Sequence, residues 1–131
     1  MVKFDGYDYD ALSVEVWNDN YRHTNETTRV ETWNRVAESC ASIEKEEIRK
    51  DIVEKFQSIL YNDKFVPGGR ILSNIGNNDR KGTTLFNCYV HNPKDIGLKD
   101  CDSIDGIYDM LKAQAKTLQS EGGYGINCSW I

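Results

Sequence analysis

The chain has 131 residues, of which 39% are hydrophobic and 28% are charged, a composition typical of a soluble globular protein with one modest core. The formal net charge of −5 argues against a surface that binds a nucleic-acid polymer, because phosphate backbones are bound by clustered Lys and Arg. The sequence has no apolar run near the roughly 18 residues of a membrane span and no signal peptide at its polar N-terminus, so we expect a cytoplasmic protein that does not bind membranes.

The first 26 residues are rich in aromatic and acidic side chains. Leu12 and Val16 indicate a short helix or turn that docks on the chain that follows. A loosely attached N-terminal arm is the alternative that this composition leaves open.

Two amphipathic helices are predicted next. Thr28 followed by Glu31 is the pattern of a capping box at the start of the first helix. Apolar residues then recur at helical spacing, at Val30, Trp33, Val36, Ala37, Cys40 and Ala41 and, in the second helix, at Ile48, Ile52, Val53, Phe56, Ile59 and Leu60. We expect the two helices to pack on each other as a hairpin with these residues in the core.

A glycine-containing turn ends this helical region. Pro67-Gly68-Gly69 predicts a turn that runs into a short extended piece through Leu72. Arg70 could contact a phosphate, but pairing with a surface carboxylate is the more ordinary role for such an arginine.

A strand that carries a cysteine follows, over residues 83–90. Turn signals bound it, Gly76 to Asp79 before it and Asn92 to Asp95 after it. Strand alternation places side chains on two faces, with Phe86, Cys88 and Val90 on one and Asn87, Tyr89 and His91 on the other.

A third helix and a second strand complete the pattern. Asp102 and Ser103 supply side-chain oxygens that can cap the helix, and Gly106 is tolerated in its first turn at some cost. Its predicted apolar stripe is Ile104, Ile107, Tyr108, Leu111, Ala115 and Leu118.

A second strand is predicted after the glycine turn at 122–125. From Tyr124 to Trp130 the side chains alternate with a period of two residues, which is typical of a strand. The order strand, helix, strand predicts parallel strands joined by a right-handed crossover.

Taken singly, the cysteines and glycines indicate little chemistry. Cys40, Cys88, Cys101 and Cys128 form no CxxC pair and lie at no ligand spacing to a histidine, so we do not expect a zinc site. Cys88 alone is more typical of a small core residue than of a catalyst. The glycines at 122–125 follow a helix and open a strand, the reverse of a dinucleotide fingerprint, so a plain helix end remains open.

The motifs in combination carry a resemblance. The ordered set FVPGGRIL (65–72), TLFNCYV (84–90), DSIDGI (102–107) and GGYGIN (122–127) resembles the N-terminal part of the catalytic subunit of ribonucleotide reductase, with wording most similar to the adenosylcobalamin-dependent branch. The resemblance runs from about Arg35 to Ile131. It implies an α/β fold in which residues 1–64 form an N-terminal helical region. Residues 65–131 would then form the first strand–helix–strand unit of a ten-stranded α/β barrel, incomplete in this chain.

The resemblance also implies an active site. In the family a thiyl radical removes the 3′ hydrogen of a ribonucleotide, and two further cysteines supply reducing equivalents as the 2′ hydroxyl leaves. Cys88 matches the first cysteine of that redox pair, and Asn87 beside it matches a substrate-binding residue. Gly122 and Gly123 match backbone positions that line the substrate, so we expect Cys88 and this glycine turn to belong to one site.

The same resemblance implies regulation and partners. Asp102, Ser103 and Ile104 match a stretch that binds an effector nucleotide at the interface of a homodimer, although capping its own helix is the alternative role for Asp102. A thioredoxin-like reductant would restore the cysteine pair. The radical would come from adenosylcobalamin or from a separate metal-containing small subunit, and this chain alone is expected to bind neither.

The implied enzyme needs residues that the 131 do not contain. In the family the radical cysteine, the partner of Cys88 and the shuttle cysteines all lie further along the chain. We therefore expect a split reductase, inactive without its C-terminal remainder, with the flank of an insertion or a truncation left open. A non-catalytic nucleotide-binding or protein-interaction module is the alternative from another class, and a structural domain is the third.

Overall fold

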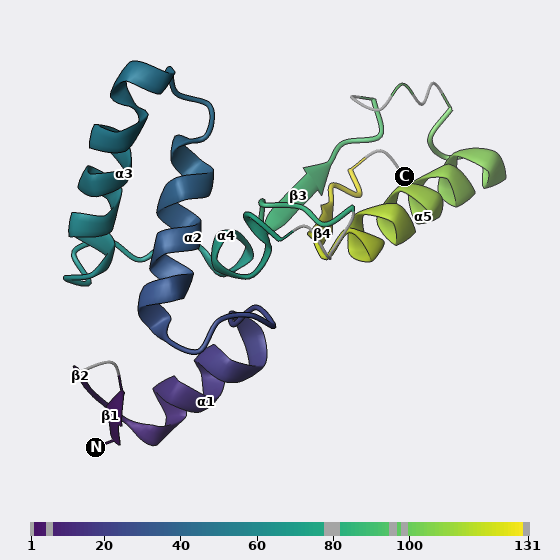
Figure 1. Cartoon of the computed structure of the whole chain (residues 1–131). Coiled ribbons are helices and arrows are strands. Elements are labelled where there is room, and N and C mark those ends of the chain that lie inside the picture. The colour runs from purple at the N-terminus through teal and green to yellow at the C-terminus, as the bar shows by residue number, and fades with distance from the viewer. Residues whose placement is uncertain (1, 5–6, 78–81, 95–96, 98–99, 130–131) are drawn as a thin grey trace. The chain divides into compact units, whose positions relative to one another are not determined.

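The computed structural model describes residues 2–4, 7–77, 82–94, 97 and 100–129 (Figure 1). The chain divides into two compact units, residues 1–80 and residues 81–131, and each is described here by itself. No helix within the described ranges is long and apolar enough to cross a membrane.

The first unit begins with two short strands and a helix. β1 (Val2–Phe4) and β2 (Tyr7–Tyr9) pair antiparallel. α1 (Ala11–Asn20) begins after Asp10, whose side chain accepts a hydrogen bond from the N–H of Ser13. Trp17 is buried, and its Nε1–H donates to Thr32 Oγ1 at 3.0 Å. The predicted helix therefore docks through Trp17, and the loose-arm alternative does not describe this segment, whereas the sequence did not indicate the two strands.

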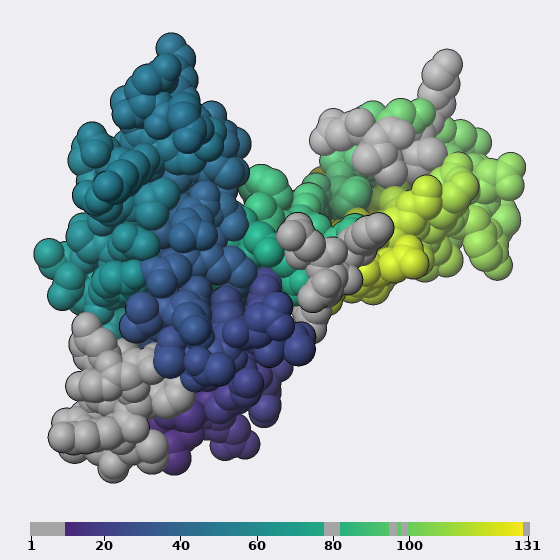
Figure 2. Space-filling view, in the orientation of Figure 1, coloured from purple at the N-terminus to yellow at the C-terminus, as the bar shows by residue number. Residues whose placement is uncertain are grey.

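The predicted helical hairpin is confirmed. α2 (Arg29–Ala41) and α3 (Glu46–Leu60) run antiparallel and pack along their length (Figures 1 and 2). Thr28 and Glu31 make both hydrogen bonds of the capping box. The buried core cluster is Trp33, Val36, Ala37, Leu60 and Leu72.

The segment after the hairpin differs from the prediction. Residues Gly69–Asn74 form a short helix, α4, with Gly68 at its N-cap, where an extended piece was expected. Leu72 from this helix is buried in the core cluster. The prediction was wrong because the Pro-Gly-Gly pattern is local, whereas the burial of Leu72 depends on α2 and α3.

The second unit is one strand–helix–strand element. β3 (Cys88–His91) and β4 (Gly123–Ile126) pair in parallel, with Cys88 opposite Gly123 and His91 opposite Ile126. α5 (Ile104–Gln119) joins them. The parallel pairing is confirmed, but both strands are shorter than predicted: residues 83–87 precede β3 and Cys128 follows β4. Asn78, Asp79, Asp95, Trp130 and Ile131, which belong to the predicted turns and strand, lie outside the described residues.

The apolar stripe predicted for α5 is largely exposed. The buried residues of α5 are Gly106 and Met110, and neither belongs to the stripe. The exposed large side chains include Ile104, Ile107, Tyr108, Leu111 and Leu118. Thr117 instead faces the sheet, where its hydroxyl lies 3.2 Å from His91 Nε2. The predicted stripe therefore does not face the two-stranded sheet, which α5 covers with another face.

Candidate functional site

Cys88 and Gly123 lie side by side on the paired strands. The Cys88 side chain is exposed. A Cβ added to Gly123 would lie 3.0 Å from Cys88 Sγ and 3.1 Å from the Asn87 carbonyl oxygen. The space beside the thiol therefore exists because residue 123 has no side chain. The structure brings together the cysteine and the glycine that the sequence assigned to one site.

The two faces of this small sheet differ in what they contact. Tyr89, His91 and Tyr124 belong to the face that packs toward α5, and the His91 and Tyr124 rings stack with centroids 4.8 Å apart. Cys88 and Val90 alternate with these residues and are exposed, Val90 to 81%. The predicted alternation is confirmed for residues 88–91, and it directs the thiol away from the helix.

The backbone N–H groups of the glycine turn are already used. The N–H of Gly122 donates to the Thr117 carbonyl at 3.0 Å, which ends α5, and the N–H of Gly123 donates to the Asn87 carbonyl at 2.7 Å. A Cβ on Gly122 would lie 2.8 Å from the Tyr89 ring. In this structure the two N–H groups therefore hold the turn and are not directed at a ligand, and Gly122 is required by its packing against Tyr89.

The start of α5 is capped by Ser103 and not by Asp102. The Ser103 hydroxyl accepts from the Gly106 N–H at 3.0 Å and donates to the Asp100 carbonyl at 2.7 Å. A Cβ on Gly106 would collide with that same Asp100 carbonyl, so this glycine is needed for close backbone approach. Asp102 and Ile104 on either side of the cap are exposed, Ile104 to 71%.

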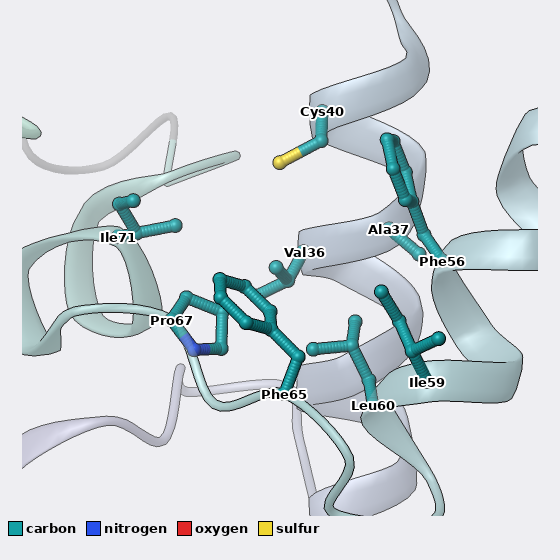
Figure 3. A pocket seen from close by; sticks show the side chains of 9 residues that line it. All are labelled: Val36, Ala37, Cys40, Phe56, Ile59, Leu60, Phe65, Pro67 and Ile71. Carbon is teal, nitrogen blue, oxygen red and sulfur yellow. The ribbon is translucent and has the colours of Figure 1, made fainter.

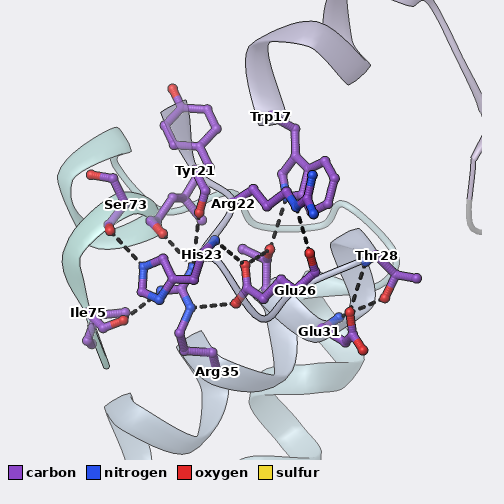
Figure 4. Close-up of polar contacts among 12 residues, drawn as sticks. Trp17, Tyr21, Arg22, His23, Glu26, Thr28, Glu31, Arg35, Ser73 and Ile75 are labelled. Atoms are coloured by element: carbon purple, nitrogen blue, oxygen red, sulfur yellow. Dashed lines mark hydrogen bonds and ion pairs between the residues drawn. The ribbon is translucent and has the colours of Figure 1, made fainter. Parts of the chain in front are cut away.

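The sequence did not indicate a buried ion pair in the first unit. Glu26 is 6% exposed, and its Oε1 accepts from Arg35 Nε at 2.6 Å (Figure 4). Its Oε2 accepts from the His23 N–H at 3.0 Å and from the Thr32 hydroxyl at 2.7 Å. The signal was weak because the two charges are nine residues apart, one in a loop and one within α2.

Burial and hydrogen bonding act in opposite directions on this carboxyl. Burial raises the pKa of Glu26, but the hydrogen bonds from Arg35, the His23 N–H and Thr32, with the positive charge of Arg35, outweigh it. The net pKa lies below the usual value. Glu26 is therefore held as a carboxylate, in keeping with its three donors.

Arg35 also donates to the backbone of two other segments. Its guanidinium donates to the carbonyls of Tyr21 at 3.2 Å, Leu72 at 2.9 Å and Ile75 at 2.6 Å. His23 adds a contact from its Nε2 to the Ser73 carbonyl at 2.9 Å. This cluster joins the end of α1, the loop before α2, α2 itself and the end of α4.

The cysteines of the chain, Cys40, Cys88, Cys101 and Cys128, are free thiols. Within the described ranges, no group of three or more His, Cys, Asp or Glu side chains is placed to hold a metal ion.

A family model described as ribonucleotide reductase, all-alpha domain, matches residues 7–80. Because the match covers more than half of the chain, the chain belongs to the ribonucleotide reductase family. The matched segment contains α1 to α4 and ends at the same residue as the first compact unit. Cys88, the glycine turn and the start of α5 lie beyond it. Searches of curated proteins and of solved structures found no match.

Proposed function

We propose that this chain is the N-terminal part of a ribonucleotide reductase catalytic subunit and supplies one cysteine of its redox pair. The observation that carries the proposal is the Cys88 thiol. It is exposed beside Gly123, on the sheet face opposite α5, in a chain whose helical segment belongs to this family. A redox cysteine must be accessible and fixed by a rigid element, and a paired strand supplies that rigidity.

The chemistry proposed for Cys88 balances with one partner thiol. A thiyl radical takes the 3′ hydrogen of a ribonucleotide and returns it after reduction. Cys88 and a second cysteine each lose a hydrogen and form a disulfide, the 2′ hydroxyl leaves as water, and the sugar gains two electrons. A thioredoxin-like dithiol then reduces the disulfide. The radical cysteine and the partner thiol would come from the remainder of the subunit.

Substrate and effector contacts belong to the same proposal. Asn87, next to the Cys88 thiol in the sequence, would bind the ribonucleotide. Gly122 and Gly123 would contact the ribonucleotide through backbone atoms other than their N–H groups, which already donate hydrogen bonds within the protein. Asp102, Ser103 and Ile104 would contact an effector nucleotide in a homodimer of the complete subunit. Since the Ser103 hydroxyl already caps α5, the exposed Asp102 carboxylate is the better candidate for a ribose hydroxyl.

The radical source is also a proposal. The residues of the four motifs favour the adenosylcobalamin-dependent branch, in which that cofactor would generate the radical. A radical from a separate metal-containing small subunit is the alternative. The role proposed for this chain is the same in both cases, since it concerns thiol oxidation and substrate contact.

The test combines the chain with a C-terminal remainder of the catalytic subunit, a radical source, a dithiol and a ribonucleotide, and measures the deoxyribonucleotide formed. We expect no product from the chain alone and sustained turnover from the mixture. Cys88→Ser should abolish sustained turnover, whereas Cys128→Ser, which removes another exposed thiol of the same unit, should retain it. Turnover by the chain alone, or normal turnover by Cys88→Ser, would contradict the proposal and favour a non-catalytic module.

A further inference from the structure

The C-terminal end of α4 is held by side chains from distant segments. The last carbonyls of any helix lack partners within the helix. Here Arg35 donates to the carbonyls of Leu72 and Ile75, and His23 donates to that of Ser73. We call His23, Glu26 and Arg35 the α4 clamp, because Glu26 fixes Arg35 through their ion pair.

The residue after this helix end fits closely against the clamp. Gly76 has a φ of +69°, a conformation that favours glycine. A Cβ at this position would collide with Ser39 Oγ and would lie 2.9 Å from Arg35 Cγ. The chain leaving α4 is therefore seated directly on α2 at Arg35.

The apolar side of α4 is packed less completely than its polar end. A hollow of about 230 Å³ lies where α4 faces the hairpin, and its lining is Val36, Ala37, Cys40, Phe56, Ile59, Leu60, Phe65, Pro67 and Ile71 (Figure 3). Phe65 at its edge is 56% exposed. Of the apolar side chains of α4, Leu72 is buried in the core cluster and Ile71 borders this open hollow, so the clamp supplements packing that depends mainly on Leu72.

We infer that α4 is a latch, closed by the α4 clamp, that can open while the α2–α3 hairpin stays folded. Opening breaks the three hydrogen bonds between the clamp and the backbone carbonyls of Leu72, Ser73 and Ile75. It also removes Ile71 from the wall of the hollow and Leu72 from the core cluster. The hairpin keeps the packing between α2 and α3 and the capping box at Thr28. The device rests on the first unit alone and does not depend on the function proposed for Cys88.

Cys40 is a built-in reporter of this opening. Its thiol lines the hollow from α2 and is half-buried, and burial raises its pKa (Figure 3). Opening the latch would expose the thiol and increase its thiolate fraction, and the thiolate is the form that reacts with alkylating reagents.

The experiment measures the alkylation rate of Cys40 in the full chain, resolved by peptide mass spectrometry, at several low urea concentrations. Arg35→Lys keeps a positive charge beside Glu26 but lacks the planar fork that serves several acceptors. We expect this variant to raise the Cys40 rate about tenfold, the factor that corresponds to about 1.4 kcal/mol. The rate should depend little on urea, because a local opening exposes little surface.

Two controls separate the latch from general destabilisation. Val53→Ala trims an α3 side chain that packs on the core cluster and takes no part in the clamp, so Cys40 should react in it through global unfolding, with a steep urea dependence. Arg49→Lys alters a surface ion pair with Glu46 on α3 and should leave the rate unchanged.

If Arg35→Lys does not fold, His23→Ala is used to test the latch. This variant removes the contact to the Ser73 carbonyl and keeps the Glu26–Arg35 pair, so the Cys40 rate should rise by less and remain insensitive to urea. The latch is rejected if the folded variant shows the wild-type rate, or if its rate rises with the urea dependence of Val53→Ala.

Discussion

Glu26 binds three donors from separate positions in the chain, and its protonation state should therefore be linked to folding. Its pKa is lowered in the folded protein from an ordinary value near 4.5. A carboxyl whose folded pKa is lowered adds stability above its unfolded pKa, and this stability is lost as the pH falls through the folded pKa. We therefore expect the free energy of unfolding to fall as the pH drops below about 4.5.

Glu26→Gln tests this linkage. At neutral pH, removing one partner of a buried ion pair costs about 3–5 kcal/mol, and we expect the lower end because Gln still offers an acceptor oxygen. Below pH 4.5 the variant should lose less further stability than the wild type. Urea unfolding at several pH values measures both effects. Glu15→Gln is the control, since it removes an exposed carboxyl of α1 that takes no part in the Glu26 cluster. Equal pH slopes for Glu26→Gln and wild type would contradict the linkage.

Gly123 should be sensitive to any side chain because of the neighbouring thiol. A Cβ there would lie 3.0 Å from Cys88 Sγ, whereas at Gly125 on the same strand the nearest atoms are 3.6 Å away, an ordinary contact. We expect Gly123→Ala to lower turnover of the reassembled enzyme at least tenfold by displacing the thiol, a positional effect of the kind that small shifts in active sites produce. Gly125→Ala should keep most of the activity. Equal activity of the two variants would show that the space beside Cys88 is not needed.

The sequence predicted part of this site and missed part of the surrounding structure. Alternation along a strand placed Cys88 and Val90 on one face, and the resemblance to the reductase family implied a glycine near the thiol. The bond from the Gly122 N–H to the Thr117 carbonyl is the local helix end that the sequence left open as an alternative. The bond from the Gly123 N–H to the Asn87 carbonyl was not predictable, because it forms only when the strands pair. The α4 clamp was missed for the same reason, since its acceptors lie about 40 residues from Arg35.

Among the elements, α5 has the cap that can be tested most directly. Ser103 makes the capping hydrogen bond, and Asp102 lies outside it. Replacing an N-cap serine by alanine costs about 1 kcal/mol. We therefore expect Ser103→Ala to lower the stability of the second unit by about this amount, and Asp102→Asn to leave it nearly unchanged. Hydrogen exchange of α5 amides measures the difference.

The same pair of variants bears on effector binding in the assembled dimer. A hydrogen bond to a charged group contributes about 1.5–3 kcal/mol, so Asp102→Asn should weaken effector nucleotide binding about tenfold if Asp102 holds a ribose hydroxyl. Effector titrations read from substrate preference measure this. Unchanged binding would leave Asp102 without a regulatory role, because the cap belongs to Ser103.

Element types were predictable wherever the signal was local. Helical periodicity and the Thr28–Glu31 box predicted α2 and α3, and the change to period two predicted β4. α4 was not predictable, because Pro67-Gly68-Gly69 reads as a turn and the helix is stabilised by Leu72 burial and by the clamp. The exposure of the α5 stripe was also not predictable, because periodicity shows that a helix has an apolar face but not what covers that face.

At the scale of the whole molecule, burial is unevenly divided between the two units. The core cluster lies entirely in the first unit. The buried apolar side chains found in the described part of the second unit are Pro93, Cys101 and Met110. Buried apolar area is the main source of stability, and a two-stranded sheet with one helix provides little of it. The first unit should therefore be the more stable of the two.

Hydrogen exchange of the full chain should show this division and its reversal on assembly. In the isolated chain we expect the slowest amide exchange in α2 and α3 and much faster exchange in β3, α5 and β4, because local stability follows buried contacts.

Adding the C-terminal remainder should slow exchange in the second unit, since its exposed stripe and sheet face would become covered. Cys88→Ser should show the same slowing, because the thiol is proposed for chemistry and not for assembly. Leu111→Asp places a charge on the exposed stripe and should reduce the slowing without changing α2 and α3. Equal protection of both units in the isolated chain would contradict the uneven division, and no slowing on addition of the remainder would contradict the proposed assembly.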